Sequence, residues 1–388
     1  MTCLFCGIDV AKFEHVASIY DPSTGEFLLD SLHFTNNDEG FKSLLAHLNT
    51  YKNYEILIGF ESTSHYHQTL FHFLTTHHFK CYLINPFITS KFRSFSLRDS
   101  KNDNIDSRAI AHFLSFDYQN LIDEKYQINE LKELSKSRDS LMTESARMKI
   151  KLKSYLDRVF PELEGIVDIN RKAIRAILKE YPTAEDIAGV RIDRLKNIAS
   201  DASQGKFNPS KIERLKEAAK SSVGFYSCAI GLNIQICIET LEQKERQIDV
   251  IEKAICSHPT IKDSPLHQLP GINDIEISYI MSAITSITQF SSPKKLVAYA
   301  GLDPKVRQSG TWSAKTTRMS KRGNKLLRYA LIWGSYNMTR KGGPMKSYYD
   351  QKRSQGKSHY NALGHCAAKL CRYIFWILNH PKEEFKYQ

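Results

Sequence analysis

The chain has 388 residues, of which 41% are hydrophobic and 25% are charged, so it can form a normal core, which excludes an intrinsically disordered chain. Its eight cysteines do not recur at zinc-finger spacing, and no apolar run reaches the roughly 18 residues of a membrane span, so we expect a cytoplasmic protein with reduced thiols that is neither secreted nor membrane-spanning. The net charge of +12 indicates an anionic partner.

Residues 1 to about 118 alternate strand and helix patterns. We expect strands at residues 4–10, 16–20, 26–34, 55–60 and 81–84, and helices at residues 38–48, 65–76 and 103–114. Strands that alternate with helices predict an α/β domain with a mixed sheet.

From residue 129 the hydrophobic pattern changes to heptads, at residues 131–159 and 230–255, with Arg138 and Ser145 interrupting the first seam. Such segments can pair as antiparallel arms or join two protomers. Between them, residues 161–225 read as a small helical insert because Pro and Gly punctuate the pattern. We therefore predict three domains, at residues 1–118, 119–258 and 259–388, the middle one an α-helical coiled coil.

The last domain is expected to be mainly α-helical. Residues 266–284 predict helix, tight turn and helix around Leu269-Pro270-Gly271-Ile272, which is similar to a helix-hairpin-helix whose turn offers N–H groups to a phosphate. An ordinary Pro-Gly turn fits the same residues equally well. A loop with Ser309 and helices near residues 325–338 and 360–378 complete the domain.

The positive charge is concentrated in this last domain. Residues 259–388 contain 21 Lys and Arg against 7 Asp and Glu, whereas residues 1–258 carry a net charge of about −2. Aromatic residues are interleaved with the basic ones, at Trp312, Tyr329, Trp333 and Tyr336. A one-sided basic field with interleaved aromatic residues favours nucleic acid as the partner over a merely solvated surface.

Four acidic residues in the first domain occupy positions that are typical of functional sites in α/β folds. Asp9 and Glu61 come at the ends of predicted strands, and Asp103 and Asp106 share one face of a predicted helix. Four converging carboxylates would repel one another, and two Mg²⁺ ions would remove that conflict and support RNase H-like phosphoryl chemistry. Each acid taken alone could be a helix cap. The histidines between residues 65 and 78 lie on and just after one amphipathic helix without a fixed ligand geometry, so we disfavour a metal role for them.

Taken together, these residues resemble the IS110/IS1111 family of transposases. The first domain carries Gly7-Ile8-Asp9-Val10-Ala11-Lys12, Glu61-Ser62-Thr63, Ile84-Asn85-Pro86 and Lys101-x-Asp103-x-x-Asp106. The last domain carries Leu269-Pro270-Gly271-Ile272, Ala298-Tyr299-Ala300-Gly301-Leu302-x-Pro304, Gln308-Ser309-Gly310, Arg318-x-Ser320-Lys321-x-Gly323-Asn324 and Leu327-Arg328-x-Ala330-Leu331. The departures are modest: Asn102 stands where Thr is usual, Ser107 where Ala is usual, and Ser64 where Gly often follows.

The resemblance implies a RuvC-like, RNase H-fold nuclease domain whose DEDD tetrad is Asp9, Glu61, Asp103 and Asp106, with Mg²⁺ as cofactor. It implies a separate transposase domain in which Ser309 is the nucleophile that attacks a DNA phosphodiester. Nearby basic residues would hold neighbouring phosphates: Arg307, Lys315, Arg318, Lys321, Arg322, Lys325 and Arg328. It also implies a structured guide RNA from the element's own ends, and a homodimer or tetramer that shares active sites between subunits.

Other functions stay open from the sequence. A site-specific DNA invertase of the same family would use the same residues. A RuvC-like junction nuclease would attack with water and would not need Ser309. A nucleic-acid binder without activity is disfavoured by the complete acidic set. In each case we expect a bacterial or archaeal protein that acts at the nucleoid.

Overall fold

The computed structural model describes residues 3–61, 65–84, 103–118, 130–304, 308–309, 312–313, 319–340 and 342–387, with only the backbone described at 103–105, 308–309 and 312–313. The chain divides into two compact units, Met1–Asn129 and Glu130–Gln388. The predicted boundaries at residues 118 and 258 stay a prediction.

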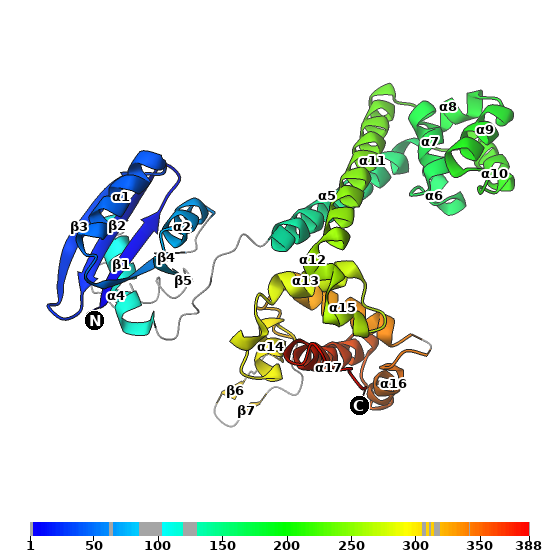
Figure 1. The fold of residues 1–388 in the computed structure, drawn as a ribbon. Coiled ribbons are helices and arrows are strands. Elements are labelled where there is room, and N and C mark those ends of the chain that lie inside the picture. Colours follow the sequence, from blue (N-terminus) through cyan, green and yellow to red (C-terminus); the bar gives the residue numbers. More distant parts are fainter. Residues whose placement is uncertain are drawn as a thin grey trace. The chain divides into compact units, whose positions relative to one another are not determined.

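The first unit is built on a five-stranded mixed sheet (Figure 1). The strands β1 (Cys3–Val10), β2 (Glu14–Asp21) and β3 (Glu26–Thr35) pair antiparallel, whereas β4 (Glu55–Glu61) and β5 (Lys80–Ile84) extend the sheet from β1 in parallel. The order across the sheet is β3-β2-β1-β4-β5, so β1 lies at its centre. Its nearly continuous apolar sequence suits a strand that is buried on both faces. The five predicted strands and the mixed sheet are confirmed.

Helices cover both faces of this sheet. The helices α1 (Asp38–Thr50) and α2 (His67–Thr76) pack on the face that carries Ile8, Ile58 and Phe60. On the opposite face, α4 (Asp103–Asp117) packs on Phe5 and Leu57. These three helices confirm the predicted ones to within about three residues.

Two helices of 30 residues each, α5 (Glu130–Val159) and α11 (Cys228–Ser257), form the long arms of the second unit (Figure 1). They run antiparallel, because Arg138 pairs with Glu252 near one end and Glu144 pairs with Lys244 further along. The start of α5 packs into the C-terminal core and its end into the core of the insert. The antiparallel pairing is one of the two predicted arrangements, and a coiled-coil supercoil stays a prediction.

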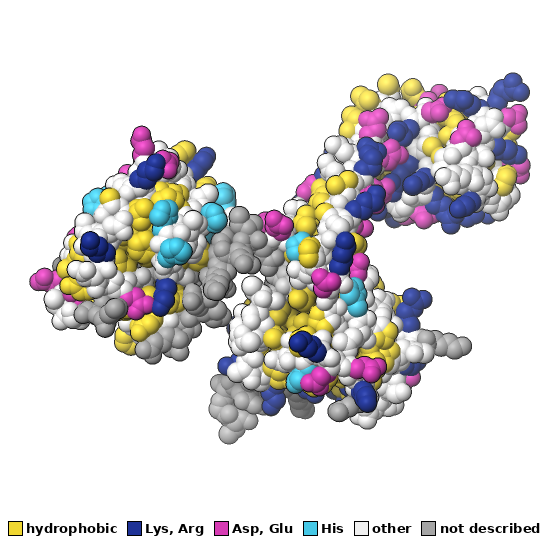
Figure 2. Space-filling view, in the orientation of Figure 1, with side chains coloured by type: hydrophobic (Ala, Val, Ile, Leu, Met, Phe, Trp, Pro, Cys, Tyr) yellow, Lys and Arg dark blue, Asp and Glu magenta, His cyan; other side chains and the backbone are white. Residues whose placement is uncertain are grey.

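Five short helices follow α5 and precede α11 in the sequence, and they form the predicted insert. They are α6 (Leu163–Ile166), α7 (Lys172–Glu180), α8 (Ala184–Gly189), α9 (Ile192–Ser203) and α10 (Pro209–Lys220). Their apolar side chains pack together with those of Leu156 and Ile234 from the arms. Local signals set the ends: Asn208 caps α10 by accepting a hydrogen bond from the N–H of Ser210, and Pro209 opens the helix. Basic and acidic side chains are intermixed on the surface of the insert (Figure 2).

The C-terminal region surrounds one core with helices. They are α12 (Pro259–Lys262), α13 (Asp274–Ala283), α14 (Pro293–Tyr299), α15 (Lys325–Met338), α16 (Lys346–Ser354) and α17 (His359–Asn379), with 3-10 turns η2 (Pro265–Gln268) and η3 (Ile287–Gln289) and a two-stranded ribbon, β6 (Gln308–Ser309) and β7 (Trp312–Ser313). The predicted mainly helical character is confirmed. None of the helices in the described parts of the chain combines the length and apolar character that crossing a bilayer requires.

The turn predicted as a helix-hairpin-helix begins with one 3-10 turn, η2, rather than with a longer helix. Gly271 adopts φ +89°, and the amide of Asn337 on α15 donates to its carbonyl oxygen over 3.0 Å. The N–H groups of Ile272 and Asn273 are used within the protein, by Leu269 O and by the Glu276 carboxylate. The turn is therefore tied to the core, and a role for it in phosphate binding stays a prediction.

Candidate functional site

Asp9 lies near the carboxyl end of the central strand β1, on the sheet face that α4 covers. Side chains alternate between the two faces of a strand, so Asp9 shares its face with Phe5 and Gly7. Phe5 packs in the cluster formed with α4. A Cβ atom at Gly7 would lie 2.2 Å from the backbone oxygen of Ser107 on α4, so strand and helix touch there without an intervening side chain.

Glu61 occupies the corresponding place on the neighbouring strand. It is the last residue of β4, and its side chain is 5% exposed. Gly59 and Leu57, two and four residues earlier, both face α4, since Leu57 packs in that cluster and a Cβ at Gly59 would touch Ile110 and Leu114. Because β1 and β4 are parallel neighbours, Asp9 and Glu61 lie at the same edge of the same face.

Asp106 lies on α4, the helix that covers this face of the sheet. It is 5% exposed and stands one turn before Ile110, which packs on the sheet. The rings of Tyr118, at the far end of α4, and Phe5 lie 5.4 Å apart between centroids, so α4 runs opposite to β1. Its first turns therefore lie toward the carboxyl ends of β1 and β4. Asp103 is the first residue of α4, and its side chain lies outside the described residues.

The hydroxyl of Ser107 helps to fix α4. It lies 2.8 Å from the hydroxyl of Ser18 on β2, and both side chains are fully buried. The N–H of Ser31 on β3 donates to the same Ser18 oxygen over 3.1 Å. A serine at position 107 thus finds a partner inside the fold, which explains how this departure from the usual family residue is accommodated one residue from Asp106.

The residue types at this edge fit divalent cations. Buried carboxylates that face one another are costly, and oxygen-rich sites of this kind are what Mg²⁺ prefers. Within the residues whose side chains are described, no three His, Cys, Asp or Glu side chains form a ready-made metal cage. The structure brings Asp9, Glu61 and Asp106 to one edge, and the metal site itself stays a proposal.

Ser309 is the last residue of β6 and pairs in register with Trp312 of β7. The two ends of the segment that carries it are joined to each other. Pro304 forms an antiparallel bridge with Met319, and the hydroxyl of Ser320 donates to the Asp303 carboxylate over 2.6 Å. The orientation of the Ser309 side chain lies outside the described residues.

The predicted phosphate-binding residues have different surroundings. Lys321 and Arg322 are exposed, and Lys325 is exposed while its ammonium lies 3.1 Å from the Asp139 carboxylate. Arg328 is half-buried and donates to the backbone oxygens of Ala300 and Gly323. Phosphate binding by these residues stays a prediction. The remaining three predicted contacts, Arg307, Lys315 and Arg318, lie outside the described residues.

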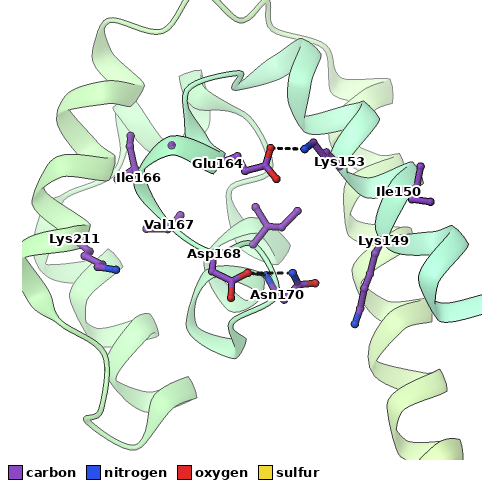
Figure 3. A pocket seen from close by; sticks show the side chains of 11 residues that line it. Lys149, Ile150, Lys153, Glu164, Ile166, Val167, Asp168, Asn170 and Lys211 are labelled. Carbon is purple, nitrogen blue, oxygen red and sulfur yellow. Dashed lines mark hydrogen bonds and ion pairs between the residues drawn. The ribbon is translucent and has the colours of Figure 1, made fainter. Parts of the chain in front are cut away.

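A second feature of the molecule is a pocket of 550 Å³ in the insert, lined by lysine side chains (Figure 3). Lys153 is paired with Glu164 at 2.6 Å, and the backbone N–H of Asn170 holds the pKa of Asp168 below its ordinary value. Lys149 and Lys211 are the other lysines of the lining. Acidic groups that offset much of the positive charge give the pocket the mixed character of the surrounding surface, so we assign no catalytic role to it.

Comparison with known proteins addresses the family directly. Residues 6–161, which include all four acids, match a family model described as a transposase, of the DEDD type named for IS110, and residues 263–350, which include Ser309, match the model of the "Transposase IS116/IS110/IS902 family". The chain belongs to the IS110 family of transposases. The predicted resemblance is thereby confirmed. The DEDD domain of this family implies an RNase H-like fold, with which the five-stranded mixed sheet agrees, and such domains are generally metal-dependent.

Two curated relatives of this IS110-family chain are proteins of insertion elements. The chain is 24% identical over 249 residues to the "Insertion element IS110 uncharacterized 43.6 kDa protein" of Streptomyces coelicolor, a match that covers 61% of the chain and 60% of that protein. It is 21% identical over 298 residues to the "Insertion element IS116 uncharacterized 44.8 kDa protein" of Streptomyces clavuligerus, covering 74% and 73%. The chain thus spans less than two thirds of the length of the first relative.

Proposed function

We propose that this protein is the transposase of an insertion sequence, an enzyme that cuts and rejoins DNA by phosphoryl transfer. Membership of the IS110 family supports the reaction class. The observation that carries the proposal is the placement of Asp9, Glu61 and Asp106 at one edge of the sheet, under the first turns of α4. The carboxyl ends of parallel strands are where α/β folds build their sites.

The carboxylates of Asp9, Glu61, Asp103 and Asp106 would hold divalent metal, with Mg²⁺ the natural choice for oxygen ligands. When bound, such ions polarise a phosphate and stabilise the attacking and leaving oxygens. The protein's own contribution is to hold the carboxylates in place. The paired strands β1 and β4 carry Asp9 and Glu61, and the close contact of α4 with Gly7 sets how near Asp106 lies to the sheet.

Ser309 supplies the nucleophile in this proposal. Its Oγ forms a bond to phosphorus as one phosphodiester P–O bond breaks, the hydroxyl proton passes to solvent, and the released DNA oxygen takes up a proton. A hydroxyl of another strand then attacks the phosphoserine and reverses the step, so the bond energy is conserved. The family resemblance and the basic surroundings of Ser309 support this role.

The partners follow from the same reasoning. The substrate is DNA, as donor and as target, and the net positive charge of residues 259–388 supports an anionic partner for that region. Guidance by a structured RNA from the element is proposed on the family resemblance alone. A site-specific invertase of the same family would share all these features and differ only in the DNA that it rearranges.

The acidic set is tested by single replacements. Asp9→Ala, Glu61→Ala and Asp106→Ala should each lower Mg²⁺-dependent strand cleavage by at least about 100-fold, because each removes an oxygen ligand from the chemical step. Thermal unfolding followed by circular dichroism should show an intact fold. Asp30→Ala is the matched control, since Asp30 is an acid of the same sheet that pairs with Arg108 instead.

Full activity in two of these three variants would remove the metal-carboxylate mechanism. Full loss in the Asp30→Ala control would show that the assay reports folding rather than chemistry. A hydrolytic junction nuclease would depend on the acidic set in the same way, and therefore this experiment establishes the metal chemistry but does not separate the two enzymes.

A further inference from the structure

Helix α15 presents an unusual stripe of exposed aromatic side chains. Tyr329, Trp333 and Tyr336 recur at the helical spacing of four and three residues and are 46%, 46% and 38% exposed. The opposite face of α15 is buried in the C-terminal core. Large aromatic side chains are costly to expose in such a row, and rows of this kind mark contact surfaces.

The stripe continues onto the start of α17. The ring of His359 lies 6.4 Å from that of Tyr336, and Tyr360, which is 82% exposed, lies 5.2 Å from His359, both between centroids. His359 is held in place because its Nδ1 lies 2.6 Å from the Tyr349 hydroxyl. We define the aromatic stripe as Tyr329, Trp333, Tyr336, His359 and Tyr360.

The rings within the stripe are spaced and tilted rather than packed flat on one another. Trp333 lies 6.1 Å from Tyr329 at an interplanar angle of 51°, and 5.6 Å from Tyr336 at 89°. In such tilted and edge contacts the rings do not stack face to face on one another, and each of the three stays at least 38% exposed. A flat aromatic group of a ligand can stack on a ring face of this kind.

Cations flank the stripe. Lys325 stands one turn before Tyr329, and Arg340 stands four residues after Tyr336, just beyond the end of α15. Lys346 lies next to Tyr349, with its ammonium 5.6 Å from the ring centroid. Two nearby carboxylates partly neutralise this charge, because Lys325 pairs with Asp139 and Lys346 pairs with Asp350. The region as a whole still carries 21 basic against 7 acidic residues, so the occupant that it favours is an anion with flat rings.

We propose that the aromatic stripe is a stacking surface for the bases of unpaired nucleotides, with the flanking cations holding the phosphates between them. Every base has a π face, so aromatic platforms in basic surroundings bind single strands with little sequence preference, whereas paired bases keep their faces stacked inside the duplex. This inference extends the proposed function, because strand exchange passes through unpaired strands, and it adds a site in a part of α15 and α17 that the chemical step does not use.

The test measures the binding of full-length protein to short labelled strands by fluorescence anisotropy. The probes are an oligothymidylate and an oligouridylate of about 12 nucleotides and a blunt duplex of the same length. Trp333→Leu keeps an apolar side chain but removes the π face. It should weaken binding of the single strands about 5- to 150-fold and leave duplex binding within about twofold, with an unchanged salt slope because the charge stays the same. The two single strands distinguish DNA from RNA as the occupant.

Tyr226→Ala is the matched control, since Tyr226 is 54% exposed in the same unit but lies outside the stripe, and it should bind all probes like the wild type. Wild-type binding of single strands by Trp333→Leu would overturn the proposal. An equal loss of duplex binding would do so too, as would a loss of protomer association in sedimentation, because the stripe would then be a protein interface. The readout needs no catalysis, so it stands even if the proposed reaction fails.

Discussion

At the scale of single residues, two arginines of the second unit pair with groups from distant parts of the chain. Arg175 is 3% exposed and donates to both carboxylate oxygens of Glu245, over 2.7 and 2.9 Å. Arg138, which the heptad pattern marks as an interruption, donates to Glu252 and to the hydroxyl of Tyr279. These arginines are therefore specific links between α7, α5, α11 and α13 rather than defects in a seam.

The Arg175–Glu245 pair gives an asymmetric prediction. Glu245→Ala leaves a buried guanidinium without its partner and should destabilise the insert by about 3 kcal/mol, whereas Arg175→Met combined with Glu245→Ala should restore most of that loss. Hydrogen exchange of the α7 amides measures the local free energy. The exposed pair Arg194–Glu180 is the control, and Glu180→Ala should destabilise the insert far less than Glu245→Ala does. A double variant as unstable as Glu245→Ala would contradict this account.

The same pair predicts a pH dependence. Burial alone would raise the pKa of the Glu245 carboxyl, but the N–H donors and charge of Arg175 lower the pKa below its ordinary value of 4.5. A lowered pKa means that the stabilisation is present above about pH 4.5 and is lost as the pH falls through the lowered value. The difference in α7 protection between wild type and Glu245→Ala should therefore shrink below pH 4.5, and a constant difference would show that charge is not its source.

At the scale of elements, the contact of α4 with Gly7 on β1 is what this account expects to position Asp106. A Cβ atom at Gly7 would lie 2.2 and 2.3 Å from backbone atoms of Ser107 and Ala111. Gly7→Ala must push α4 away from β1 and shift Asp106, so cleavage should fall at least about 100-fold. Gly59→Ala is the graded control, because its Cβ would meet only side-chain ends, the nearest being Ile84 Cδ1 at 3.0 Å. Equal activity of the two variants in a cleavage assay would contradict the assigned role of this contact.

Periodicity predicts elements well here because the faces of the helices and strands are distinct. The pattern places the helix at residues 325–338, where α15 is found, and Asn324 caps it by accepting from the N–H of Leu327. The 3-10 turn η2 and helix α16 are less predictable, since α16 has no buried residue to give it an apolar stripe. A weak pattern of that kind is outweighed by tertiary context.

The candidate site is predictable in part for the same reason. The predicted bounds of the strands are enough to put Asp9 and Glu61 at strand ends. The direction of α4, which brings Asp106 to them, depends on contacts with Gly7 and Phe5 that lie about 100 residues away. Tyr336 and His359 lie on two different helices, so their ring contact cannot be predicted from sequence spacing.

At the scale of the whole molecule, charge is divided unevenly along the chain, and nucleic-acid binding should depend steeply on salt. Lys321→Glu with Arg322→Glu should weaken binding of duplex DNA and reduce the salt slope by about 0.9 for each phosphate that the variant no longer neutralises. Lys206→Glu in the insert is the control, since Lys206 is exposed where basic and acidic residues are mixed. An unchanged salt slope in the double variant would show that Lys321 and Arg322 are not part of the DNA-binding surface.

Assembly is the second property at this scale. Recombination holds two DNA segments at once, so we predict a dimer or tetramer joined through the arms, whose exposed apolar residues include Ile236 and Val250, 51% and 65% exposed. Ile236→Glu with Val250→Glu should yield monomers in sedimentation velocity. Val223→Glu, at an 84% exposed site outside the arms, should not. A wild-type protein that stays monomeric with nucleic acid bound would contradict the prediction.

The central claim is that Ser309 is the nucleophile of a DNA strand-transfer reaction, and denaturing electrophoresis with labelled donor DNA, Mg²⁺ and any guide RNA encoded beside the gene tests it most directly. The account predicts a slow-migrating covalent adduct with the wild type and with the control Ser313→Ala, which changes a hydroxyl on the paired strand β7. Ser309→Ala should give neither adduct nor strand exchange while it still binds DNA. An adduct that persists in Ser309→Ala, or clean cutting by that variant with no adduct in either protein, would contradict the account.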